Sequence, residues 1–182
     1  MQVYLKNTDE VLTIPVSVKK LRQGFDVLQE NEVMVTEIEC GCVNQNFDSE
    51  EPVEIYVLHY LALLLEILSS EERELLGAIL NSDAVEIHTI ADFINVIFNL
   101  NCYKLHEDIH SEEEWARQWL IEQGDMEGHF MDEEMLIWLD NYLDLSKVWR
   151  NEFGDGSFTE AGYLEKVKEN RILYDERENY NN

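Results

Sequence analysis

Basic residues are scarce in this chain. It has 13 lysines and arginines against 39 aspartates and glutamates, and its formal net charge at pH 7 is −26 over 182 residues. A protein with this balance repels nucleic acid and anionic membranes, and it attracts basic surfaces at long range. The scarcity therefore argues against direct nucleic-acid binding and predicts that any macromolecular partner is basic.

Cysteines and long apolar runs are also few. The longest apolar run, residues 53–68, is broken by two glutamates and a histidine, so it is not expected to span a bilayer. The first residues lack the basic start and apolar core of a signal peptide. The cysteines are odd in number, lack paired metal-ligand spacing and are Cys40, Cys42 and Cys102. Reduced thiols in a cytoplasm, without membrane contact, are the simplest expectation.

The chain does contain enough apolar material to fold. Hydrophobic residues make up 45% of it and aromatic residues 10%, which argues against a disordered acidic tail. The periodicity predicts an α+β fold of three small units with a polar tail at 168–182. The expected units are a mixed sheet and helix unit at 1–50, an all-helical unit at 51–100 and a C-terminal α+β unit at 101–167.

Local patterns place the expected elements. Strands are expected near 3–5, 11–14 and 33–38, with a helix over 17–25 and a loop over 44–52. Helices are expected over 53–68, 70–80 and 89–99, the last two opened by the capping boxes at Ser69 and Thr89. Further on, the pattern predicts a strand over 101–106, a helix over 111–123 and a loop over 124–131. A helical stretch from about 132 through 149 is followed by a strand pair that ends near 167, with Gly154 to Gly156 as its turn.

One motif suggests zinc chemistry. His106-Glu107-Asp108-Ile109-His110 matches the HExxH pattern, in which two histidines on one helical face bind zinc and the glutamate activates a water. A capping box at Ser111 and Glu114, however, starts a helix only after the second histidine. A zinc peptidase is therefore a minor alternative, and the main expectation is two solvent-facing or locally hydrogen-bonded histidines.

Other catalytic patterns are missing from the sequence. The Gly-Asp-Gly run at 154–156 lacks the flanking acids of a calcium loop, and there is no phosphate-binding glycine-rich loop, dinucleotide fingerprint or nucleophile elbow. We therefore predict a protein that is not an enzyme and uses no cofactor or metal.

The negative charge is concentrated in the middle of the chain. Residues 50–140 hold 22 acids and only 3 bases, and these acids are interleaved with apolar residues at helical spacing. In DNA, 26 charges would correspond to about 44 Å of duplex, or about 13 base pairs. One interpretation is a solvated surface that promotes solubility. The other is a surface that binds a basic partner. Such poor charge compensation costs stability, which is expected only where a function needs the negative charge.

The second interpretation assigns partner binding to a group of acids, none of them decisive alone. The predicted group comprises Glu71, Glu72, Glu74, Glu107, Asp108, Glu112, Glu113, Glu114, Glu122, Asp125, Glu127, Asp132, Glu133 and Glu134.

Several short motifs, in order along residues 1–167, resemble one family. They are the opening Met-Gln-Val-Tyr-Leu, Thr13-Ile-Pro-Val16, the segment at 68–76, the Trp-Ala-Arg-Gln-Trp-Leu-Ile-Glu segment at 115–122, Leu139-Asp-Asn-Tyr-Leu-Asp144, Arg150, and Gly-Ser-Phe with Gly162. Together they are similar to the ArdA antirestriction family. The chain departs from that family at Leu145 and Val148, where tyrosines are usual, and at Asn151, where an aspartate is usual.

The resemblance implies a specific function. Members of that family are carried by mobile elements such as conjugative transposons, mimic bent B-form DNA, and occupy the DNA-binding groove of type I restriction-modification enzymes. It also implies an elongated chain of three units, a homodimer formed through the C-terminal unit, and no catalysis. The alternative is an acidic, chaperone-like protein that binds a basic partner without mimicking DNA.

Overall fold

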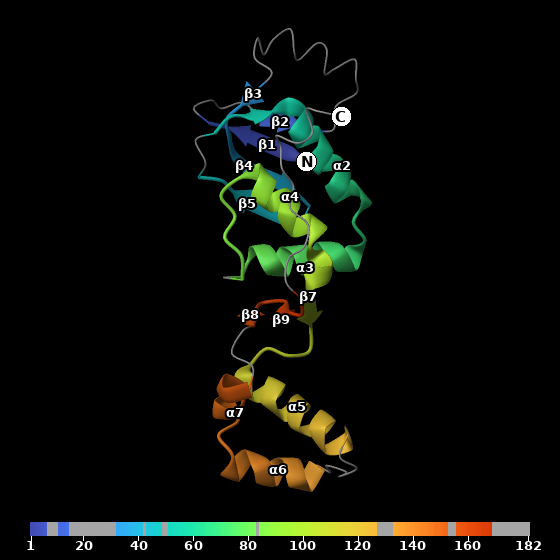
Figure 1. The fold of residues 1–182 in the computed structure, drawn as a ribbon, viewed down its shortest axis with the longest axis vertical. Coiled ribbons are helices and arrows are strands. Elements are labelled where there is room, and N and C mark those ends of the chain that lie inside the picture. The colour runs from blue at the N-terminus through green and yellow to red at the C-terminus, as the bar shows by residue number, and fades with distance from the viewer. Residues whose placement is uncertain are drawn as a thin grey trace. The chain divides into compact units, whose positions relative to one another are not determined.

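The computed structural model describes residues 1–6, 11–14, 32–41, 43–48, 51–82, 84–126, 133–152 and 156–168. These residues form an α+β protein with three small sheets and several helices, as the sequence predicts. The fold divides into two compact units (Figure 1). Unit 1 contains the described residues up to Tyr103 together with Lys168, and unit 2 spans Lys104–Val167.

The main sheet of unit 1 has four antiparallel strands in the order β2-β1-β4-β5. Alternation along β1 and β4 buries Val3, Leu5 and Ile38 on one face, while their neighbours in sequence lie nearer solvent. The strands of this unit are β1 (Gln2–Leu5), β2 (Val11–Thr13), β3 (Glu32–Val33), β4 (Val35–Cys40), β5 (Val43–Asn46) and β6 (Val53–Glu54).

The fourth strand of that sheet was not expected. Residues 44–46, predicted as loop, belong to β5 and pair with Glu37–Glu39 of β4. Their amide side chains are typical of loops, but buried Val43 and Phe47 anchor the segment at both ends. Strand propensity depends on such packing more than on the residues themselves, which explains why the sequence prediction failed here. The helix expected over 17–25 lies outside the described residues.

Three helices follow the strands in unit 1, and two of them begin where the sequence predicts. Ser69 and Glu72 form a complete capping box, and so do Thr89 and Asp92. The expectation that Val53 begins a helix was wrong by two residues, because Val53 and Glu54 pair with β3. The elements are α2 (Ile55–Ile67), α3 (Ser70–Leu80), α4 (Ile90–Phe98) and a 3-10 turn η1 (Leu100–Cys102).

Helix and sheet share one core in unit 1. Phe47, just after β5, lies 6.2 Å from Phe93 of α4 between ring centroids, and both side chains are buried. Helix α3 also contacts β5, and α2 contacts β6 and α4. The residues on either side of position 50 therefore pack together in this structure, and the three-unit organisation stays a prediction.

Unit 2 combines three helices with a small sheet in the order β7-β9-β8. Buried Trp115 of α5, Trp149 of α7 and Tyr163 of β9 meet in its core. The elements are β7 (Tyr103–His106), α5 (Glu112–Met126), α6 (Glu133–Tyr142), α7 (Leu145–Glu152), β8 (Ser157–Thr159) and β9 (Gly162–Lys166).

Three expectations for this unit were wrong in detail. Helix α5 continues through Gly124 to Met126, because one glycine costs a helix only about 0.5–1 kcal/mol and does not end it. The single helical stretch expected from 132 to 149 is two helices, since Asp144 accepts a hydrogen bond from the Lys147 amide at 3.1 Å and starts α7. The β8–β9 hairpin turns at Glu160 and Ala161, and Gly156 precedes it.

Substitutions at two glycines are expected to change stability in opposite directions. Gly77 lies inside α3 with open space around its Cα, so Gly77→Ala is expected to stabilise unit 1 by about 0.5–1 kcal/mol. Gly162 has φ +134°, and a Cβ there would collide with the carbonyl oxygen of His106. Gly162→Ala should therefore destabilise unit 2. Urea unfolding followed by circular dichroism measures both, and a destabilising Gly77→Ala would contradict the open geometry.

Candidate partner-binding surface

The predicted acids of unit 1 lie on the exposed side of α3. Glu71, Glu72 and Glu74 are all exposed, while Leu76 and Ile79 of the same helix are buried. The nearest base in sequence, Arg73, donates hydrogen bonds from Nη2 to the carbonyl oxygens of Leu65 and Glu66, both at 3.1 Å. Its guanidinium is therefore engaged with the end of α2, and within the described residues it forms no ion pair with these carboxylates.

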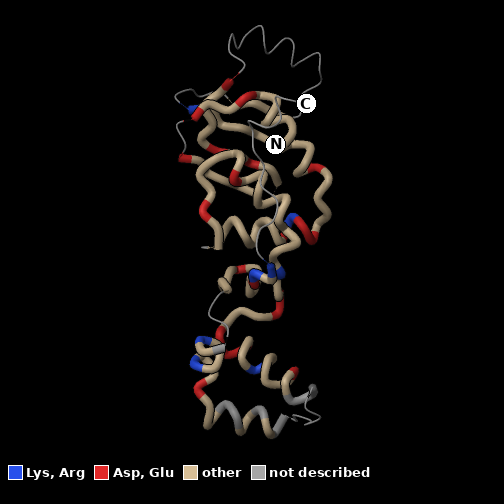
Figure 2. The backbone as a smooth tube through the Cα atoms, in the orientation of Figure 1, with Lys and Arg blue, Asp and Glu red and all other residues tan. Residues whose placement is uncertain are grey.

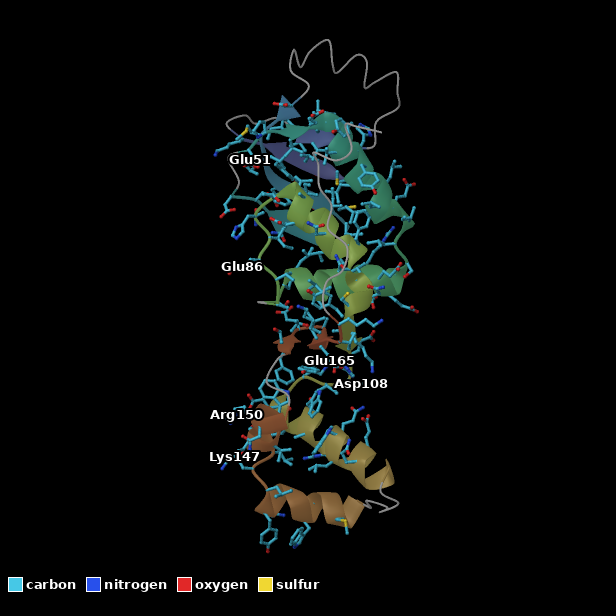
Figure 3. The ribbon with its side chains drawn as sticks, in the orientation of Figure 1. Glu51, Glu86, Asp108, Lys147, Arg150 and Glu165 are labelled. Carbon is cyan, nitrogen blue, oxygen red and sulfur yellow. The ribbon has the colours of Figure 1, made fainter. Side chains whose placement is uncertain are left out.

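A second exposed group of acids follows β7 in unit 2. Glu107 and Asp108 lie in the turn between β7 and α5, and both side chains are exposed; Figure 3 labels Asp108. Glu122 is exposed on α5 and accepts a hydrogen bond from Gln118 at 3.1 Å. Over the described backbone, acidic positions occur throughout both units and outnumber basic ones (Figure 2).

The three glutamates at the start of α5 have a different environment. Glu112 forms an ion pair with Arg150 of α7 at 3.5 Å, and Glu113 accepts a hydrogen bond from the hydroxyl of Ser146, also on α7. That hydrogen bond, helped by the charge of Arg150, holds the pKa of Glu113 below its ordinary value of 4.5. These two carboxylates join α5 to α7 within unit 2.

The third glutamate of this run caps the helix. The amide of Glu114 donates to the Ser111 hydroxyl at 3.2 Å, and the Glu114 carboxylate accepts from the amide of His110 at 2.7 Å. The predicted capping pair is therefore present, with the carboxylate reaching one residue further back than a standard box. Glu72 has a similar capping role at Ser69, whose amide donates to its carboxylate at 2.8 Å.

The predicted acids thus divide into two classes. Glu72, Glu112, Glu113 and Glu114 hold helix ends or join helices, and Glu122 accepts a hydrogen bond from Gln118 within α5. In contrast, four carboxylates make no hydrogen bond or ion pair with any described residue: Glu71, Glu74, Glu107 and Asp108. We call these four the unpaired acids. The side chains of Asp125, Glu133 and Glu134, and the whole of Glu127 and Asp132, lie outside the described parts of the chain.

The HExxH histidines do not share a helical face. His106 is the last residue of β7, and its Nε2 lies 3.0 Å from the Glu165 carboxylate of β9. His110 is exposed and precedes α5. Within the described residues, no group of three or more His, Cys, Asp or Glu side chains is arranged to hold a metal ion.

Two histidines in unit 1 have shifted pKa values of opposite sign. A hydrogen bond to Asp48 at 3.1 Å, together with the charges of Asp48 and Glu86, raises the pKa of His88 above 6.5. Burial lowers the pKa of His59 on α2, whose Nε2 is buried without a hydrogen-bond partner among the described residues. Relative to a histidine with the ordinary pKa, the folded state therefore favours the protonated form of His88 and the neutral form of His59.

Exposed apolar faces are a feature that the sequence analysis missed. On α6, Trp138 is 57% exposed and Tyr142 70% exposed, and their ring centroids are 4.6 Å apart. On α2, four large side chains also face solvent, although the other side of this helix is buried: they are Tyr56, Tyr60, Leu63 and Ile67. Their regular spacing was visible in the sequence, but a helix that is apolar all round is usually buried all round, so spacing alone did not reveal the exposed side.

A scan against protein-family models matched no family, and a search of curated proteins found no match. No helix in the parts of the chain that the structure describes is long and apolar enough to cross a bilayer.

The shifted pKa values of His88 and His59 predict how the stability of unit 1 depends on pH. His88, with a raised pKa, stabilises the fold below pH 6.5, and this contribution is lost as the pH rises through its folded pKa. His59, with a lowered pKa, contributes stability above pH 6.5 that is lost as the pH falls through its folded pKa. NMR titration should place the two midpoints on opposite sides of 6.5.

The control for this titration is Asp48→Asn. It should lower the midpoint of His88 and leave that of His59 unchanged, because only His88 contacts Asp48. A His88 midpoint that does not move would contradict the contact.

Proposed function

We propose that this chain is an antirestriction protein whose acidic surface mimics DNA and blocks the DNA-binding groove of type I restriction-modification enzymes. The observation that carries the proposal is the set of unpaired acids, Glu71, Glu74, Glu107 and Asp108, which are exposed on helix or turn backbone. Carboxylates that make no hydrogen bond or ion pair with a described residue remain available to a basic partner. The resemblance of the sequence motifs to the ArdA family supports the choice of partner.

The mechanism is charge complementarity. In the enzyme's groove, lysines and arginines that otherwise contact phosphates contact carboxylates, so DNA and the inhibitor exclude one another. Because a folded carboxylate surface has fewer conformations to lose than a disordered acidic tail, less entropy opposes binding. The interaction should weaken steeply as salt rises, since both partners are screened.

Neutralising the unpaired acids tests the proposal. Glu71→Gln, Glu74→Gln, Glu107→Gln and Asp108→Asn together remove four charges without touching a capping or interhelical contact. At about 0.5 kcal/mol for each exposed contact, the quadruple variant should bind its target about thirtyfold more weakly. The measurement is plating of unmodified phage on a type I restricting host, with competition against DNA by the purified protein.

The matched control keeps the charge at the same four positions. Glu71→Asp, Glu74→Asp, Glu107→Asp and Asp108→Glu should preserve relief of restriction. No relief by the soluble wild-type chain would refute the proposal for this enzyme class. Binding to unrelated basic proteins without competition against DNA would favour the chaperone-like alternative.

The exposed face of α6 supports a second element of the proposal, a homodimer formed through unit 2. Large, adjacent aromatic rings are typical centres of protein interfaces, and Trp138 and Tyr142 are both largely exposed. They lie in the unit through which the family resemblance implies dimerisation.

Sedimentation measures this association. Trp138→Ala with Tyr142→Ala should shift the protein from dimer to monomer, while Val167→Gln, a change at an exposed apolar residue at the end of the sheet, should leave the dimer intact. Dimerisation should strengthen with salt, because each copy carries a net charge of −26. A dimer that persists in the double variant would place the interface elsewhere.

A further inference from the structure

Helix α2 is apolar on two sides. Its inner side is buried against the core of unit 1 through residues such as Leu58, Leu61 and Leu65. Its outer side exposes Tyr56 by 46%, Tyr60 by 38%, Leu63 by 53% and Ile67 by 77%. We call these four residues the outer stripe of α2.

The outer stripe has the spacing of a helix-pairing seam. Its members are separated by four, three and four residues, which aligns them along one side of a helix over about 16 Å. The ring of Tyr60 also contacts Phe98 of α4 edge-on, with 6.4 Å between centroids, and this contact helps to fix its direction. A second helix with apolar residues at matching positions could lie along this seam.

The charge around the stripe is one-sided. Glu66 is the only charged residue of α2 over Ile55–Ile67, and the last turn of this helix contains no basic residue of its own. The hydrogen bonds from Arg73 to the carbonyl oxygens of Leu65 and Glu66 hold the start of α3 against the end of α2. Exposed Glu71 lies in that first turn, so the Ile67 end of the stripe has the exposed carboxylates of Glu66 and Glu71 against the single guanidinium of Arg73.

We propose that the outer stripe of α2 is a docking site for an amphipathic helix of a partner protein, one that carries lysine or arginine beside its apolar face. The apolar residues of that helix cover the stripe, and its basic residues meet Glu66 and Glu71. A second copy of this chain fits less well, because it brings the same acidic end and the same net charge. This inference does not depend on DNA mimicry, because it concerns apolar contacts within unit 1.

The area suits a reversible contact. Four side chains of about 200 Å² each, roughly half exposed, would bury on the order of 400 Å² on this protein. An interface of that size on each partner lies at the low end for specific complexes, where transient interactions are found.

A designed peptide tests the proposal with the full-length protein. The probe is a labelled 14-residue peptide with leucines spaced four, three and four apart and lysines elsewhere. The control peptide has the same composition in scrambled order, and binding is followed by fluorescence anisotropy in about 0.3 M salt, which screens general attraction. We expect the patterned peptide to bind at least about tenfold more tightly than the scrambled one.

Variants of the protein locate the contact. Leu63→Gln with Ile67→Gln should weaken binding of the patterned peptide by about tenfold or more, because half-exposed apolar side chains lose their burial. Both residues face solvent, so the fold should persist, which circular dichroism checks. Val167→Gln is the matched control and should have no effect.

Three results would overturn the proposal. Equal binding of both peptides would show that the lysines are attracted by the acidic protein and that the spacing of the leucines does not matter. Equal binding of the patterned peptide by the double variant would place the contact elsewhere. Self-association of the wild-type chain that is lost in Leu63→Gln with Ile67→Gln would make a second copy the occupant. Relief of restriction is measured separately, so failure here is distinguishable from failure of the proposed function.

Discussion

Like-charge repulsion is the constraint under which this chain folds. With 39 acids and 13 bases, ion pairing can offset only a minority of the carboxylates. In the described structure, several of them act instead as hydrogen-bond acceptors for backbone amides. Glu72, Asp92, Glu114 and Asp144 each accept from an amide at the start of a helix, where the helix dipole favours negative charge. Repulsion is thereby offset locally, element by element.

That use of carboxylates separates structural acids from available ones. The sequence shows three equivalent glutamates at 112–114, but their contacts differ. Glu112 pairs with Arg150, Glu113 accepts a hydrogen bond from Ser146, and Glu114 caps α5. In contrast, Glu107 and Asp108, a few residues earlier, make no hydrogen bond or ion pair with a described residue. If the acidic surface competes with DNA, its effect should come mainly from residues of the second kind. Substitutions at the first kind would lower binding and stability together.

The exposed apolar residues are the second feature that bears on the proposed partner contacts. A highly charged protein can remain soluble with apolar helix faces in water, because net charge keeps the molecules apart. The aromatic pair on α6 and the outer stripe of α2 are each compact, and each belongs to a separate unit. Charge attracts a partner from a distance, while apolar contacts of this kind limit how fast it leaves.

Much of the fold was predictable from local sequence. The α+β class, the helix starts at Ser69, Thr89 and Ser111, and the strand that ends at His106 all follow from short-range patterns, because a cap or an alternation depends on residues within a few positions. Those same patterns showed that the HExxH histidines would not lie on one helix. The strand at Val43–Asn46 and the extension of α5 through Gly124 were not predicted, since pairing and packing with distant residues decide them.

The candidate site shows the same division. The sequence by itself determined the charge, its concentration in the middle of the chain and the helices that carry it, because composition and periodicity are local properties. Only the tertiary structure decided which acids are available. The contacts of Glu112 with Arg150 and of Glu113 with Ser146 join residues more than 30 positions apart. The exposure of Leu63 and Ile67 likewise depends on which side of α2 the core of unit 1 covers.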